Sequence, residues 1–221
     1  MSAPVQLPMK FTLPVSYAAA DFILGDANRS AATILDDLSR WPEPVLALVG
    51  PSGAGKTHLL HWLMERHQGV LLDAASIGSP PPAPFWALDD IAQFKGEEAL
   101  VRLMNDCRAG AGKLLLAASE QPSRLVTRLP DLHSRLSAVI TLTLAPPDEA
   151  MLAALLTKHF TDRQLRVAPE VIAYLVARME RSYEAAAHAA AWLDEAAIAS
   201  ARAVTLNLAR QYLELQQASL R

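Results

Sequence analysis

The sequence has a single cysteine, no long apolar run and almost no net charge. Cys107 has no second cysteine in the chain with which to form an internal disulfide, so a reducing compartment is expected. No apolar run approaches the ~20 residues that cross a bilayer, and the first residues lack the basic and apolar regions of a signal peptide. We therefore expect a cytoplasmic protein that has no membrane contact.

The low net charge also limits the class of partner. The 221 residues include 20 basic and 23 acidic ones, mixed along the chain, for a formal net charge of -3. This balance argues against a broad basic face for bare duplex DNA, although it leaves room for a small local basic patch. Hydrophobic residues make up 52%, which predicts a folded protein, and the alanine-rich last third favours closely packed helices.

Short continuous apolar runs, each bounded by turn residues, predict strands that are covered on both faces. They are "PVLALVG" (44–50), "GVLLDA" (69–74), "FWALDD" (85–90), "KLLLAAS" (113–119) and "AVITLTL" (138–144). Helical patterns lie between most of them, at 57–67, at 96–109 and in a broken region at 122–136. This alternation predicts an α/β fold with a five-stranded parallel sheet and right-handed crossovers.

After Pro146 the pattern changes to helices alone, starting with a proline and acidic residues that suit a helix N-terminus. We therefore predict a boundary near residues 145–147. The expected division is an N-terminal segment of residues 1–16, an α/β nucleotide-binding domain of residues 17–145, and a small all-α lid domain of residues 146–221.

The stretch "GPSGAGKT" fits the G-x-x-x-x-G-K-[ST] pattern of a phosphate-binding loop, or P-loop. It follows an apolar strand and opens a helix, where loop N–H groups and the helix N-terminus can surround phosphate oxygens. Lys56 is expected to reach the outer phosphates and Thr57 to hold Mg²⁺. The residues predicted to bind nucleotide here are Gly50, Pro51, Ser52, Gly53, Ala54, Gly55, Lys56 and Thr57.

Two carboxylates, Asp89 and Asp90, end the predicted strand "FWALDD", at the edge of the sheet where ligands bind in open α/β folds. Asp89 suits a partner of Mg²⁺, and Asp90 suits a group that orients the attacking water. Alternatively, the two aspartates cap a helix that begins at "IAQF". The nearby P-loop favours the catalytic interpretation.

Arg135, in "LHSRLS", precedes the last predicted strand and has two interpretations. It is either a solvated residue at a helix end or an arginine presented to a phosphate on a neighbouring molecule. The second role, in which the guanidinium neutralises transition-state charge in trans, can be worth 10³ to 10⁵ in rate.

Near the N-terminus, "QLPMKF" places Leu7, Met9 and Phe11 at alternate positions. Pro8 disfavours a helical Leu7, so an extended peptide with these three side chains on one face is expected. Taken alone, the stretch from Gln6 onward is either the frayed start of a strand or a tag that another protein binds.

Several of these stretches together resemble the AAA+ module of the DnaA/Hda family of bacterial replication proteins, from about Tyr17 to the C-terminus. They are "DFILGDANRSA", "GPSGAGKTHLLH", "LDDIAQF" and "EEALVRLMNDCRAGAGKLLLAASEQPSRL". "GKTHLLH" and "DDIxxF" are typical of that family. Besides the P-loop, the resemblance implies nucleotide contacts at Phe22, Ile23, Gly25, Asn28, His58, Ser119 and Arg181. It also matches Arg135 to the arginine finger of the family.

Departures from the initiator pattern indicate a shorter, regulatory branch of the family. No helix-turn-helix domain follows the lid, no partner-loading domain precedes the module, and eleven residues separate Asp73 from Phe85, where initiators insert helices. Members of the regulatory branch begin with a Gln-Leu-x-Leu-x-Phe/Leu motif that binds the sliding clamp. "QLPMKF" fits it, with Met9 for the second leucine, so Gln6, Leu7, Pro8, Met9 and Phe11 are the expected clamp contacts.

One departure lies in the lid, where the family places its sensor-2 arginine. This chain has Glu184 at the aligned position and Arg181 one turn earlier. Either Arg181 substitutes for the missing arginine, or the protein hydrolyses its own ATP badly.

The resemblance thus implies a negative regulator of replication initiation that binds ADP or ATP with Mg²⁺. While bound to the DNA-loaded sliding clamp, it would stimulate hydrolysis of ATP bound to DnaA, and it would meet DNA indirectly through the clamp. Two alternatives remain: an autonomous P-loop ATPase or kinase, and a DnaA-like adaptor that acts at the origin without the clamp. A homo-oligomer is compatible with each.

Overall fold

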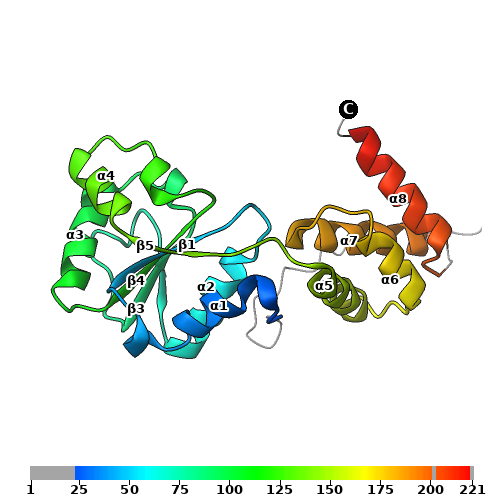
Figure 1. Cartoon of the computed structure of the whole chain (residues 1–221), viewed down its shortest axis with the longest axis horizontal. Helices are drawn as coiled ribbons and strands as arrows, with labels where there is room; N and C mark the ends of the chain where they lie inside the picture. The colour runs from blue at the N-terminus through cyan, green and yellow to red at the C-terminus, as the bar shows by residue number, and fades with distance from the viewer. Residues whose placement is uncertain (1–22, 201–202, 220–221) are drawn as a thin grey trace, which may run out of the picture.

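The structure is a computed structural model that describes residues 23–200 and 203–219. Figure 1 shows its helices and strands in chain order. They are α1 (Asp26–Leu35), η2 (Leu38–Arg40), β1 (Val45–Val49), α2 (Lys56–His67), β2 (Val70–Leu72), β3 (Phe85–Leu88), η3 (Ile91–Gln93), α3 (Glu97–Arg108), β4 (Lys113–Ala118), η4 (Pro122–Arg124), α4 (Pro130–Ser137), β5 (Ile140–Thr143), α5 (Glu149–Asp162), α6 (Pro169–Val176), α7 (Tyr183–Ser200) and α8 (Leu206–Ser219).

The five strands form one parallel sheet in the order β2-β3-β4-β1-β5, so β1 lies between β4 and β5. Both faces of β1 are buried because its alternate side chains enter different cores. Val45, Ala47 and Val49 pack with α3 and α4, whereas Leu46 and Leu48 pack with α1 and α2. The strand is therefore apolar at every position.

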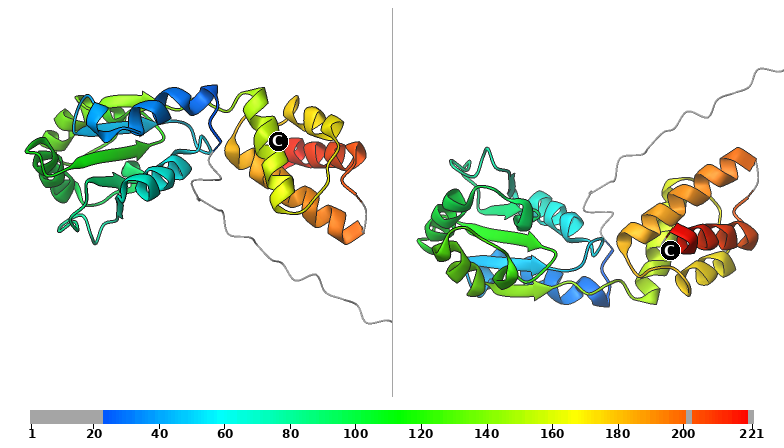
Figure 2. Two further views of the ribbon diagram at one scale, coloured as in Figure 1. Left: turned by 90° about the horizontal axis from the view of Figure 1, so that it is seen from below. Right: turned by 90° about the horizontal axis from the view of Figure 1, so that it is seen from above.

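The C-terminal helices α5 to α8 have a hydrophobic core of their own. In Figures 1 and 2 they lie together beside the sheet, to which the segment between β5 and α5 connects them. Asp148 caps α5, where its carboxylate accepts a hydrogen bond of 2.7 Å from the N–H of Met151. Alanines of α7 at the centre of this core, such as Ala186, Ala189 and Ala190, allow the helices to pack closely.

The predicted five-stranded parallel sheet and the helical C-terminal part are confirmed. The last strand is shorter than expected, because Ala138 is the C-cap of α4. The broken region consists of η4, a loop and α4. The Glu97 carboxylate fixes this loop by accepting hydrogen bonds of 3.0 and 2.9 Å from the N–H groups of Arg128 and Leu129. The division into residues 1–16, 17–145 and 146–221 stays a prediction.

Within the described ranges, no helix is both long and apolar enough to cross a membrane.

Candidate nucleotide site

The P-loop turn joins β1, an interior strand of the sheet, to helix α2. Gly53 has a φ of +70° and Gly55 a φ of +87°, both in the left-handed region that favours glycine. Gly55 is also the N-cap of α2. The sequence therefore places glycine where the turn needs it, and the N-terminus of α2 provides a favourable field for phosphate.

Lys56 lies in the first turn of α2 and folds back over the loop. Its ammonium group donates hydrogen bonds to the carbonyl oxygens of Gly50, at 2.8 Å, and Pro51, at 3.0 Å. Burial lowers the pKa of Lys56, and the negative charges of Asp89 and Asp90 act in the opposite direction. The charged ammonium group is thus held at the loop, where it can meet a phosphate.

Asp89 follows β3 and joins the P-loop through Thr57. The Thr57 hydroxyl donates a hydrogen bond of 2.7 Å to Asp89 Oδ2, and Asp89 Oδ1 accepts one of 3.0 Å from the N–H of Asp90. Two oxygen-bearing side chains suit Mg²⁺, which keeps several waters and takes its other oxygens from the phosphates. No group of three or more His, Cys, Asp or Glu side chains in the described part could hold a metal ion by itself.

Asp90 has a φ of +48° and precedes η3. Its side chain makes no capping hydrogen bond to that helix, and it is exposed at the edge of the sheet. The geometry therefore gives no support to a capping role for Asp90.

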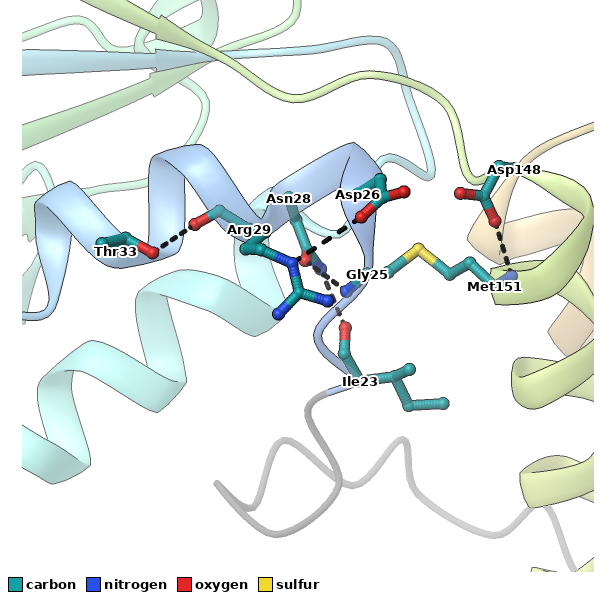
Figure 3. A network of polar contacts seen from close by, with 8 residues as sticks. All are labelled: Ile23, Gly25, Asp26, Asn28, Arg29, Thr33, Asp148 and Met151. Carbon is teal, nitrogen blue, oxygen red and sulfur yellow. Dashed lines mark hydrogen bonds and ion pairs between the residues drawn. The ribbon is translucent and has the colours of Figure 1, made fainter.

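Asn28 is almost completely buried, with 2% exposure, at the start of α1. Its Oδ1 accepts from the N–H of Gly25 at 3.0 Å, and its Nδ2 donates to Ile23 O at 2.9 Å and to the Tyr183 hydroxyl at 3.1 Å. Figure 3 shows the first two bonds and the Met151 side chain pointing toward Gly25. Both amide protons of Asn28 are used within the protein, so it acts by fixing the segment before α1.

Tyr183, the first residue of α7, connects the helical part to the P-loop. Its N–H donates a hydrogen bond of 2.8 Å to Gly53 O, and its hydroxyl donates one of 2.9 Å to Met151 Sδ. A Cβ on Gly55 would lie 3.2 Å from the Tyr183 ring. Burial raises the pKa of Tyr183 to about 12, so the hydroxyl keeps its proton. No local sequence signal points to Tyr183, because its contact with Asn28 spans 155 positions.

The other predicted nucleotide contacts have different surroundings. Ser119 follows β4 and is exposed, and His58 is half-buried in the first turn of α2.

Arg181 is exposed and forms an ion pair of 2.7 Å with Glu149 of α5. Glu184 contacts the P-loop, because its Oε2 accepts a hydrogen bond of 3.4 Å from Ser52. Phe22 and the predicted clamp contacts at 6–11 lie outside the described residues.

Arg135 lies on α4 and is held by two side chains. Its Nε pairs with Asp131 Oδ2 at 3.0 Å, and its Nη1 donates a hydrogen bond of 2.5 Å to Asn105 Oδ1 of α3. Its side chain is 22% exposed. The spacing of four between Asp131 and Arg135 could have revealed the first partner from the sequence, whereas the second depends on the packing of α3 against α4.

No family model matches the chain. An uncharacterized protein of Haemophilus influenzae is 26% identical in an alignment 233 residues long, gaps included. The alignment covers 95% of this chain and 99% of that protein. Domain III of the replication initiation protein DnaA from Thermotoga maritima superposes with a TM-score of 0.74 at 17% identity, over 90% of this chain and 95% of that structure. The chain has a DnaA-like AAA+ fold.

Other AAA+ structures superpose on a smaller share of their own length. The Holliday junction branch migration motor RuvB of T. maritima has a TM-score of 0.67 at 16% identity, over 86% of this chain and 69% of that one. AMPPCP-bound DnaA from Aquifex aeolicus has a TM-score of 0.64 at 19% identity, over 81% and 65%. At these identities the likeness establishes the AAA+ fold of this chain, and its function has to be argued from its own residues.

Replacement of Lys56 tests the site directly. We expect Lys56→Ala to weaken binding of a fluorescent ADP analogue at least tenfold, because the loop loses its charged phosphate contact. Lys95 is exposed and lies outside the site, so Lys95→Ala is the control variant. We expect it to bind the ADP analogue with the affinity of wild type. Titration of both variants, with their thermal unfolding as a check on folding, measures the effect. Equal affinity of Lys56→Ala and wild type would contradict the assignment.

Proposed function

We propose that this chain is an Hda-like negative regulator of replication initiation. It binds ADP or ATP with Mg²⁺ at its own P-loop and is held on the DNA-loaded sliding clamp by residues 6–11. In that position it presents Arg135 in trans to ATP bound by DnaA and stimulates its hydrolysis. The AAA+ fold and its likeness to DnaA domain III support a partner of the same fold, because AAA+ modules of one type can pack edge to edge.

The observation that carries the proposal is the position of Arg135. Its hydrogen bonds go to α3 and to its own helix, whereas the lysine and the aspartates of its own nucleotide site lie at the carboxyl ends of the strands. The guanidinium group is thus held away from the chain's own nucleotide site and remains partly exposed. An arginine so placed can neutralise charge that develops on a phosphate of a neighbouring module.

The residues around the chain's own P-loop fit an adenine nucleotide with Mg²⁺. Gly53 and Gly55 shape the loop, Lys56 supplies positive charge, and Thr57 with Asp89 supplies oxygen ligands for the metal. Bound Mg²⁺ would neutralise phosphate charge. Asp90 is the proposed group that orients water. We expect weak turnover by this chain alone, because Glu184, which accepts a hydrogen bond from Ser52 of the P-loop, is an acid where the family resemblance expects an arginine.

The role of Arg135 is tested in a single-turnover assay. DnaA loaded with labelled ATP is mixed with clamp on DNA and with this protein, and the release of phosphate is followed. We expect Arg135→Ala to lower the stimulated rate about a hundredfold or more, because the transition-state charge loses its cation. Arg124→Ala, at an exposed arginine of η4, is the control and should stimulate fully.

Wild-type stimulation by Arg135→Ala would contradict the mechanism. Rapid hydrolysis by this protein without DnaA, abolished by Lys56→Ala, would favour an autonomous ATPase instead.

Clamp binding by residues 6–11 is tested separately. Burial of Leu7, Met9 and Phe11 yields roughly 5–9 kcal/mol gross, and ordering of six backbone residues costs roughly 6–12 kcal/mol. The peptide should therefore bind reversibly and gain from a second contact or a second copy. We expect the double variant Leu7→Ala, Phe11→Ala to lose binding to immobilised clamp, while Lys10→Ala binds normally and all variants bind ADP. Undiminished clamp binding by the double variant would refute this role.

A further inference from the structure

The contact between the first turn of α7 and the tip of the P-loop involves backbone and side chains. The N–H of Tyr183 donates to Gly53 O at 2.8 Å, and Ser52 donates to Glu184 Oε2 at 3.4 Å. A Cβ on Gly53 would lie 3.0 Å from the Glu184 Cβ and 3.1 Å from its backbone nitrogen. The lid therefore touches the P-loop through its own residues, and a carboxylate lies at the contact.

The end of α7 that meets the P-loop is a helix N-terminus, which by itself favours an anion. Glu184, in the first turn, already supplies negative charge there. The field of the helix thus stabilises the carboxylate of the protein and is less available to a phosphate.

The cations nearest to this contact, Arg181 and Lys56, have partners other than Glu184. Arg181 pairs with the exposed Glu149 at 2.7 Å, and Lys56 bonds to carbonyl oxygens of the loop and lies near Asp89 and Asp90. A bound phosphate would therefore bring more negative charge to a loop that has acidic groups on two sides. Like charges repel, although the exposed position of Glu184 allows water and salt to weaken the effect.

We propose that Glu184 competes with nucleotide phosphate for the P-loop, so that nucleotide binding loosens the contact of the lid instead of tightening it. A cation at this position would have the opposite effect, because it would attract the phosphate and draw the lid onto the loop. This inference rests on the proposed nucleotide binding.

The lid is able to respond because Glu184 and Tyr183 share one helical turn. In this proposal, displacement of Glu184 carries the first turn of α7 with it, so that the Tyr183 N–H leaves Gly53 O. The Tyr183 hydroxyl, which Asn28 and Met151 hold at 3.1 and 2.9 Å, resists that movement. The occupancy of the P-loop is thus coupled to the position of α7 through two neighbouring residues.

The test measures affinity of the full-length protein for AMP, ADP and ATP with Mg²⁺ at low and high salt. We expect Glu184→Gln to bind ADP and ATP about 3- to 10-fold more tightly than wild type at low salt, with a smaller gain for AMP and at high salt. Glu184→Arg should increase the affinity for ADP and ATP further than Glu184→Gln does. The matched control is Glu195→Gln, an exposed glutamate further along α7, whose affinity should stay within about twofold of wild type by the same screening argument.

Hydrogen exchange of the Tyr183 amide, measured in the same samples, reports whether its hydrogen bond to Gly53 O is kept. ADP should speed this exchange in wild type and slow it in Glu184→Arg. Equal or weaker nucleotide binding by Glu184→Gln, or ADP-induced protection of the Tyr183 amide in wild type, would overturn the inference and leave the nucleotide site standing. Absence of binding in wild type and in all variants would instead overturn the nucleotide site itself.

Discussion

The turn between β1 and α2 is the constraint on which the rest of the site depends. It requires a left-handed backbone at Gly53 and Gly55, and it leaves carbonyl oxygens that Lys56 binds. Because β1 lies inside the sheet, between β4 and β5, this turn emerges at the carboxyl ends of the strands, within reach of Asp89, which follows β3. A parallel sheet places all of these strand ends at one edge, which is why residues far apart in the sequence meet there.

The chain has two separate sets of charged groups that suit phosphate chemistry. One surrounds its own P-loop and contains more carboxylates than cations, including Glu184 of the lid. The other is Arg135 on α4, which Asp131 and Asn105 hold in place. The proposed function uses both sets: the first would hold the chain's own nucleotide, and the second would offer an arginine to the nucleotide of a partner.

Much of the fold could be predicted from the sequence because both faces of the central strands are buried, which makes their apolar runs continuous. The P-loop could be located for a similar reason, since it follows a strand end and opens a helix, and the roles predicted separately for Thr57 and Asp89 are compatible with the hydrogen bond that joins them. The contacts of Tyr183 and Asn105 could not be predicted, because they depend on how helices pack across the molecule. The same packing uses both amide protons of Asn28, a residue that the family resemblance places beside the nucleotide.

The role of Arg135 can be seen directly in a structure of this protein bound to the clamp on DNA and to DnaA that carries a non-hydrolysable ATP analogue. We predict that the Arg135 guanidinium leaves Asp131 and Asn105 and lies within hydrogen-bonding distance of the terminal phosphate on DnaA. A DnaA site that met a different surface of this protein, with Arg135 still bound to Asp131 and Asn105, would rule out an arginine finger at this position.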